Sequence, residues 1–345
     1  MVFTRMDKYL VSELTIKVLK NGGLVMSKTI FNYLVSSLFL LTSHTLVAQT
    51  FPTNSIRMVV PYAAGGSADV LSRPISQAMS KVLGQTVYTE LKPGAGGNIG
   101  AELVSKSAPD GYTLLFASLS LSTSISFAKL NFDPRTDLKA IAGIATLPSL
   151  LLVSNQSNIK TFDDLIGEAR KGNVSFASAG PTTGSHLFGE LVKSKSKTNM
   201  VHIPYKGSGA AYPDLIAGRV TFMFDVMGSA LPQVKGGQVR AIAVTSSKRS
   251  SVLPDTPTLN ELGYPGFDVG TWFGVFVPSA TPIPVQRTLE EAVLASLNTP
   301  EVIAQLASVM ADPVPRKGAD FGRWYIEDTE KWAKLAKEGT IKISD

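Results

Sequence analysis

The 345-residue chain contains no cysteine, which excludes disulfide bonds, thiolate metal ligands and a cysteine nucleophile. It has only three histidines, and it lacks the Gly-x-Ser-x-Gly elbow, the His-Glu-x-x-His motif and an aspartate-rich metal loop. No basic run with interleaved aromatic residues is present, which argues against nucleic acid as a partner. We therefore expect neither a metal nor another cofactor.

The composition is that of a globular protein with a mild positive charge. A hydrophobic content of 44% without low-complexity tracts indicates a chain long enough for two lobes with cores of their own. The formal net charge is +6, but 28 basic and 25 acidic residues lie beyond residue 48, so the net charge of that part is +3.

The N-terminal region has the three parts of a secretory signal. Met26-Ser27-Lys28 is a short basic start, and residues 30–41 form an apolar run too short to span a bilayer, which needs about 20 residues. Leu46-Val47-Ala48 offers a cleavage site before Gln49. We predict that residues 1–25 are a spurious extension, that residues 26–48 are a signal peptide removed near Ala48, and that the protein is periplasmic. An uncleaved N-terminal anchor is the alternative.

A turn of small residues lies between a predicted strand and a predicted helix. Residues 56–60 are mostly β-branched and apolar and stop at a proline, which predicts a strand, and apolar residues recur at helical spacing over residues 70–83. The segment that includes the turn is Val60-Pro61-Tyr62-Ala63-Ala64-Gly65-Gly66-Ser67-Ala68-Asp69. Small residues let a ligand approach the backbone, and the first N–H groups of a helix lack internal partners. The turn is therefore a candidate carboxylate site, with a plain tight turn as the alternative.

Two more segments repeat this order of strand, turn and helix. They are Glu90-Leu91-Lys92-Pro93-Gly94-Ala95-Gly96-Gly97-Asn98-Ile99-Gly100 and Ser178-Ala179-Gly180-Pro181-Thr182-Thr183-Gly184-Ser185, the second before a helix that starts near His186. Ligands of α/β proteins bind at such turns, at the carboxyl edge of a parallel sheet. Residues 118–126 are rich in serine and predict a loop, which either supplies hydroxyl donors to a ligand or only connects two elements.

The ordered series of motifs resembles one family. Besides the three turns, it includes Ala108-Pro109-Asp110-Gly111-Tyr112, Lys160-Thr161-Phe162-Asp163-Asp164-Leu165, Pro204-Tyr205-Lys206-Gly207, Leu253-Pro254-Asp255-Thr256-Pro257-Thr258 and Gly274-Val275-Phe276-Val277-Pro278. Over residues 51–345 the chain resembles the periplasmic solute-binding receptors of tripartite tricarboxylate transporters, the Bug family.

The resemblance implies an α/β, two-lobed type II periplasmic binding protein fold with the ligand cleft between the lobes. Residues 49–151 and 273–345 would form the discontinuous lobe 1, and residues 152–272 would form lobe 2. It also implies a small carboxylate ligand (a di- or tricarboxylate, an acidic amino acid or an aromatic carboxylate) held mainly by main-chain amides. A monomeric receptor would deliver this ligand to two integral membrane transporter subunits, one large and one small.

The candidate ligand-binding residues lie in these turns or at strand ends beside them. They are Tyr62, Ala63, Ala64, Gly65, Gly66, Ser67, Ala68, Asp69, Asn98, Ser118, Gly180, Pro181, Thr182, Thr183, Gly184, Ser185, His186, Tyr205, Lys206, Gly207 and Asp225.

Several of these residues have two readings. Tyr62 and Tyr205 either pack on the ligand or belong to the core, and Lys206 is either a carboxylate partner or a surface charge. We favour a helix cap for Asp69, whereas Asp225 is a candidate acceptor for an amino or hydroxyl group of the ligand. The alternatives to a transport receptor are a carboxylate-sensing receptor and an α/β enzyme that acts on a carboxylate.

Overall fold

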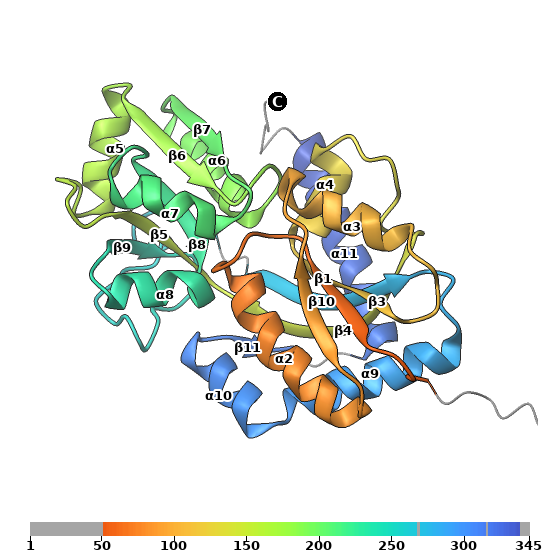
Figure 1. Ribbon diagram of the computed structural model, residues 1–345. Helices are drawn as coiled ribbons and strands as arrows, with labels where there is room; N and C mark the ends of the chain where they lie inside the picture. The colour runs from red at the N-terminus through yellow and green to blue at the C-terminus, as the bar shows by residue number, and fades with distance from the viewer. Residues whose placement is uncertain (1–50, 268–269, 315–316, 339–345) are drawn as a thin grey trace, which may run out of the picture. The chain divides into compact units, whose positions relative to one another are not determined.

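The computed structural model describes residues 51–267, 270–314 and 317–338, so the predicted signal peptide lies outside the described residues. These residues form two separate β-sheets, each with helices packed on it (Figure 1). The first sheet has the strand order β11 (Asp312–Pro313), β4 (Leu138–Leu147), β10 (Thr271–Pro278), β3 (Thr113–Ser118), β1 (Ile56–Val60) and β2 (Val87–Leu91). The second has the order β7 (Met200–Pro204), β6 (Val174–Ser178), β8 (Phe222–Val226), β5 (Ser149–Ser154) and β9 (Val239–Val244).

The chain passes between the two sheets twice. It leaves the first sheet at Leu147 and enters the second at Ser149, and it returns to the first sheet with β10. Strands β1, β2 and β3 are parallel, whereas β10 pairs antiparallel with both β3 and β4. A strand from late in the sequence therefore lies inside the first sheet.

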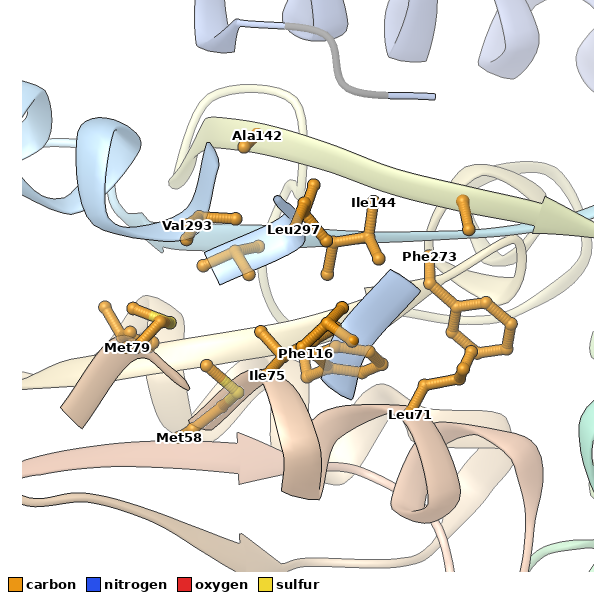
Figure 2. Close-up of a cluster of buried hydrophobic side chains, with 14 of the residues drawn as sticks. Met58, Leu71, Ile75, Met79, Phe116, Ala142, Ile144, Phe273, Val293 and Leu297 are labelled. Carbon is orange, nitrogen blue, oxygen red and sulfur yellow. The ribbon is translucent and has the colours of Figure 1, made fainter. Parts of the chain in front are cut away.

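Both faces of the first sheet are buried by helices. One face is covered by α2 (Ser67–Leu83), α9 (Ile283–Leu297) and α10 (Pro300–Ser308), and the other by α3 (Asn98–Ser105), α4 (Ser120–Phe127) and α11 (Gly318–Lys337). Side chains alternate across a strand, so Met58 and Phe116 join one core while Val59 and Leu115 join the other. Figure 2 shows Met58, Ile75 and Phe116 gathered between α2 and the sheet.

The second sheet has the same two-sided packing. The helices on its two faces are α5 (Phe162–Arg170) with α6 (Gly184–Ser196), and α7 (Ser208–Ile216) with α8 (Met227–Lys235). On the α6 face the rings of Phe176 and Phe222 stack with their centroids 5.5 Å apart, whereas Ala177 and Met223 pack toward α7 and α8. Strands buried on both faces explain the continuous apolar runs of the sequence.

Residues close in sequence mark the ends of several helices. Thr161 and Asp164 form a complete capping box at the start of α5, and Gly84 ends α2 with φ +65°. The loop predicted for residues 118–126 is wrong, because most of this segment is the helix α4. Buried Leu119 and Leu121 anchor it against the core, which outweighs the weak helix propensity of serine.

Candidate functional site

A cavity of about 50 Å³ lies between the two sheets, at the edge where β1, β3, β6 and β8 end. The predicted site residues that line it are Tyr62, Gly66, Ser67, Ala68, Ser118, Thr183, Gly184, Ser185 and Asp225. Ala179, Ser208, Val226, Thr271 and Phe273 complete the lining. The structure thus brings together the first and third glycine-containing turns, which are more than one hundred residues apart in the sequence.

Four helices begin at this cavity. The N-cap residues of α2, α6, α7 and α8 are Gly66, Thr183, Gly207 and Val226, and none of them makes a side-chain cap. Within the described ranges, the backbone N–H groups of Ser67, Ala68, Gly184 and Ser185 donate to no protein group. A helix N-terminus carries roughly half a positive charge, so this cavity suits an anion.

The lining contains one acidic side chain, Asp225, and no lysine or arginine. Asp225 is only 3% exposed, and its Oδ2 accepts hydrogen bonds from the hydroxyls of Tyr212 and Ser229, both at 2.6 Å. Its Oδ1 accepts from the N–H of Val226 at 2.9 Å. The pKa of Asp225 is raised overall, because the effect of burial is larger than the opposing effect of the hydrogen bonds from Ser229, Tyr212 and Ser208.

Tyr62 forms the wall between this cavity and a smaller one. Its hydroxyl bonds Ser118 Oγ at 2.6 Å and also bonds the hydroxyl of Ser120. Burial raises the pKa of Tyr62, so the phenol stays neutral. The smaller cavity, of about 10 Å³, is lined by the start of α3, including Asn98. Tyr62 and Ser118 line both cavities, so they lie between the second glycine turn and the candidate site.

The turns of the two sheets are in direct contact. The N–H of Ala63 donates to the carbonyl of Lys206 at 3.0 Å, and the N–H of Ser229 donates to Ser67 Oγ at 2.9 Å. Farther along, Thr123 Oγ1 donates to the carbonyl of Thr182 at 2.6 Å. Each bond joins a turn or helix beside the first sheet to one beside the second sheet. The three bonds therefore hold the two sides of the cavity together.

Glycine is required where these turns meet. A Cβ on Gly96 would lie well inside 3.0 Å of the Pro181 carbonyl oxygen, and one on Gly209 would do the same to the carbonyl of Ala64. Carbon atoms do not approach backbone oxygens so closely, so any larger residue at either position forces the turns apart.

The other predicted site residues lie outside the lining of the cavity. They are Ala63, Ala64, Gly65, Asp69, Asn98, Gly180, Pro181, Thr182, His186, Tyr205, Lys206 and Gly207. Asp69 accepts a hydrogen bond from the N–H of Gly65 at 3.0 Å and forms an ion pair with Arg73 at 2.7 Å, so it supports the start of α2.

Tyr205 and Lys206 do not contribute side chains to the cavity either. The hydroxyl of Tyr205 donates to Asp214 Oδ2 at 2.5 Å, and its ring packs against the core below α7. Lys206 is exposed, and it takes part in the contact between turns through its carbonyl.

Two histidines lie beneath the third turn. The N–H of Thr182 donates to His186 Nδ1 at 3.2 Å, and the His186 ring stacks on His202 with centroids 3.7 Å apart. His202 Nε2 lies 2.6 Å from Ser178 Oγ, which in turn bonds the backbone of Gly180. Burial lowers the pKa of His186 to about 3 and that of His202 to about 4. Both rings are neutral supports of the turn.

Five lining residues are not among the predicted site residues: three adjoin a predicted residue in the sequence, and two come from a distant strand. Ser208 follows Gly207 at a helix start just as Ser67 follows Gly66, so a local signal for it existed. Ala179 and Val226 adjoin predicted residues. Thr271 and Phe273 come from β10, whose place inside the first sheet has no local signal.

Within the described ranges, no helix is both long and apolar enough to cross a membrane. In the same part of the chain, no three histidine, cysteine or acidic residues gather as a possible metal site.

Known proteins share this architecture. A family model described as "Tripartite tricarboxylate transporter family receptor" matches residues 71–341. The UPF0065 protein of the tcbD-tcbE intergenic region of Pseudomonas sp. (strain P51) is 38% identical over 295 residues, which are 84% of this chain and 87% of that protein. The solved structure of the periplasmic binding protein BugD matches with a TM-score of 0.82 and 33% identity, over 85% of this chain and 99% of the other. MatC from Rhodopseudomonas palustris with bound malate matches with a TM-score of 0.79 and 33% identity, over 83% of this chain and 100% of the other.

Proposed function

Because the chain belongs to the tripartite tricarboxylate transporter receptor family, we propose that it is a periplasmic binding protein for a small carboxylate. It captures the ligand between lobe 1, which contains the first sheet, and lobe 2, which contains the second. The lobe boundaries expected at residues 151 and 273 shift to Pro148 and Thr271, because β5 begins at Ser149 and β10 at Thr271. It then delivers the ligand to the membrane subunits of a tripartite tricarboxylate transporter. The observation that carries the proposal is the meeting of four helix N-termini at one cavity without a lysine or arginine.

Main-chain amides replace the hydration that a buried carboxylate loses. A hydrogen bond to a charged group contributes roughly 1.5–3 kcal/mol, so four or five donors can hold a carboxylate without a salt bridge. The N–H groups of Ser67, Ala68, Gly184 and Ser185 are free to serve as such donors within the described part of the chain. Binding through the backbone also explains why alanine, glycine and serine make up these turns.

Ligand entry requires the two lobes to separate. A cavity of about 50 Å³ has room for only a few water molecules. The bonds from Ala63 to Lys206 and from Ser229 to Ser67 cross the cleft and break when it opens. A ligand that contacts both turns favours the closed arrangement, because it binds that arrangement better than the open one. The closed molecule is the form that the membrane subunits recognise.

The protein binds its ligand and releases it unchanged. A hydrolytic reaction needs a base next to a nucleophile, but His186 and His202 lie beneath the third turn rather than in the lining of the cavity. Both are also neutral at physiological pH, and His202 already bonds Ser178. A binding role therefore fits this site better than catalysis does.

A panel of carboxylates tests the proposal. Purified protein starting at residue 49 is screened by thermal shift with di- and tricarboxylates, amino acids and aromatic carboxylates, and each hit is titrated by calorimetry. Ser185→Leu, which fills the cavity, should abolish binding; because it also removes the hydrogen bond from the N–H of Ala179 to Ser185 Oγ at 2.9 Å, circular dichroism checks that the variant is folded. Ser194→Leu, on the exposed side of the same helix, should bind as the wild type does.

Two results would contradict this function. One is the absence of any carboxylate that shifts the melting temperature, and the other is chemical change of the ligand, detected by NMR after incubation. Delivery is tested separately, by uptake of the labelled ligand into vesicles that contain the two membrane subunits, with and without the purified receptor.

A further inference from the structure

Asp225 places a buried carboxyl group in the wall of the cavity. An ionised carboxylate offers about four acceptor positions. Tyr212, Ser229 and the N–H of Val226 occupy three of them, at 2.6, 2.6 and 2.9 Å. Ser208, which also lines the cavity, bonds Asp225 as well. Asp225 is thus fixed in orientation in the wall of the cavity, where a donor group of a ligand can replace the hydroxyl of Ser208.

No cationic side chain of the described residues pairs with this carboxyl group. None of the ion pairs within the described residues includes Asp225. Arg73, near the start of α2, pairs with Asp69 instead, and Lys206 is exposed outside the cavity. A second carboxylate brought beside Asp225 would therefore meet an unscreened like charge in a buried place.

We propose that the ligand of this cavity is a carboxylate that also carries an ammonium group, and that Asp225 is the residue that selects it. The inference rests on the proposed function, because it narrows the ligand of the same site. The helix N-termini hold the carboxylate, and the ammonium group donates to Asp225. The carboxylate of the ligand then faces the positive ends of the helix dipoles, and its ammonium group faces the carboxyl group of Asp225.

An ammonium group satisfies Asp225 better than a hydroxyl group does. Both can donate a hydrogen bond, but only the ammonium group cancels the charge, and charge-assisted hydrogen bonds are roughly twice as strong as neutral ones. Burial raises the pKa of Asp225, which means that its charged form lacks compensation in the free protein. A cation in the cavity would supply that compensation.

Matched ligands isolate this contribution. Aspartate, malate and succinate share a four-carbon skeleton and differ only in bearing an ammonium, a hydroxyl or a hydrogen at one carbon. Glutamate, 2-hydroxyglutarate and glutarate repeat the series with five carbons, and alanine, lactate and propionate with three. For each skeleton that binds the wild type, we expect the ammonium compound to bind at least tenfold more tightly than the other two.

Asp225→Asn tests the role of the residue itself. The variant removes the charge and retains the size of the side chain, so the preference for the ammonium compound should fall at least tenfold. Asp214→Asn is the matched control, because Asp214 also accepts from a tyrosine hydroxyl in the same lobe but does not line the cavity. It should leave the preference unchanged.

The outcomes separate this inference from the proposed function. If no carboxylate of any class binds, the proposed function fails. The inference alone is overturned if a carboxylate without an ammonium group is the tightest ligand of the whole panel, or if folded Asp225→Asn retains the preference. Succinate that binds best and weakens as the pH rises would mean that Asp225 is protonated in the complex, which also overturns it. If Asp225→Asn does not fold, the wild-type series decides.

Discussion

Gly209→Ala should weaken ligand binding without destabilising the protein. Gly209 is the second residue of α7, where alanine is a better helix former than glycine by up to about 1 kcal/mol. Its Cβ, however, would lie well inside 3.0 Å of the Ala64 carbonyl oxygen on the other side of the cleft. The two turns must therefore separate by about 1 Å, and such overpacking costs about 1–3 kcal/mol.

This cost applies only to the closed arrangement, because an open cleft contains no contact between Gly209 and Ala64. A penalty of about 1–3 kcal/mol on the ligand-binding form corresponds to a roughly 5- to 150-fold loss of affinity. Calorimetric titration with the best ligand of the panel measures this loss. Thermal unfolding without ligand should give a melting temperature equal to or above that of the wild type.

Gly167→Ala is the control for this experiment. Gly167 lies in α5 of the same lobe, and a Cβ there meets no atom within 4 Å. The variant gains the same helix propensity without a clash, so its affinity should equal that of the wild type. Unchanged affinity in Gly209→Ala, or an equal loss in both variants, would refute the argument that the contact between Ala64 and Gly209 belongs to the binding form.

Three further predictions concern stability, each measured by urea unfolding. Below pH 6.5, unfolded histidines bind protons that folded His186 and His202, with pKa values of about 3 and about 4, do not bind. Stability is therefore lost as the pH falls toward 4, by about 1.4 kcal/mol per pH unit and histidine. Over this pH range the wild type should lose more stability than a variant with glutamine in place of both histidines, because in that variant only the buried acids still titrate. An equal dependence of the free energy of unfolding on pH in the two proteins would contradict this. Thr161→Ala removes the capping box with Asp164 and should cost about 1 kcal/mol, so an unchanged midpoint would argue against the cap. Phe116→Ala, in the core of the first sheet, should cost about 3–5 kcal/mol, and a loss below 1 kcal/mol would mean that the core closes around the gap.

The parts of the fold that follow from neighbouring residues could be predicted. The start of α5 is encoded by Thr161 and Asp164, and the end of α2 by Gly84, because capping and left-handed backbone depend only on residues close in sequence. The serine-rich α4 could not be predicted in this way. Its helix depends on burying Leu119 and Leu121 against strands that are distant in the sequence.

The same distinction applies to the candidate site. The sequence by itself determined that residues 63–66 and 179–183 form turns of mostly small residues before helices, since small side chains there leave the first helical amides accessible. Only the tertiary structure decided which residues share the cavity. It placed Asp225, Ser208 and Thr271 in the wall and Tyr205 away from it. The reason is physical: the cavity forms where the edges of two separately packed sheets meet, and that meeting depends on the insertion of β10 between β3 and β4.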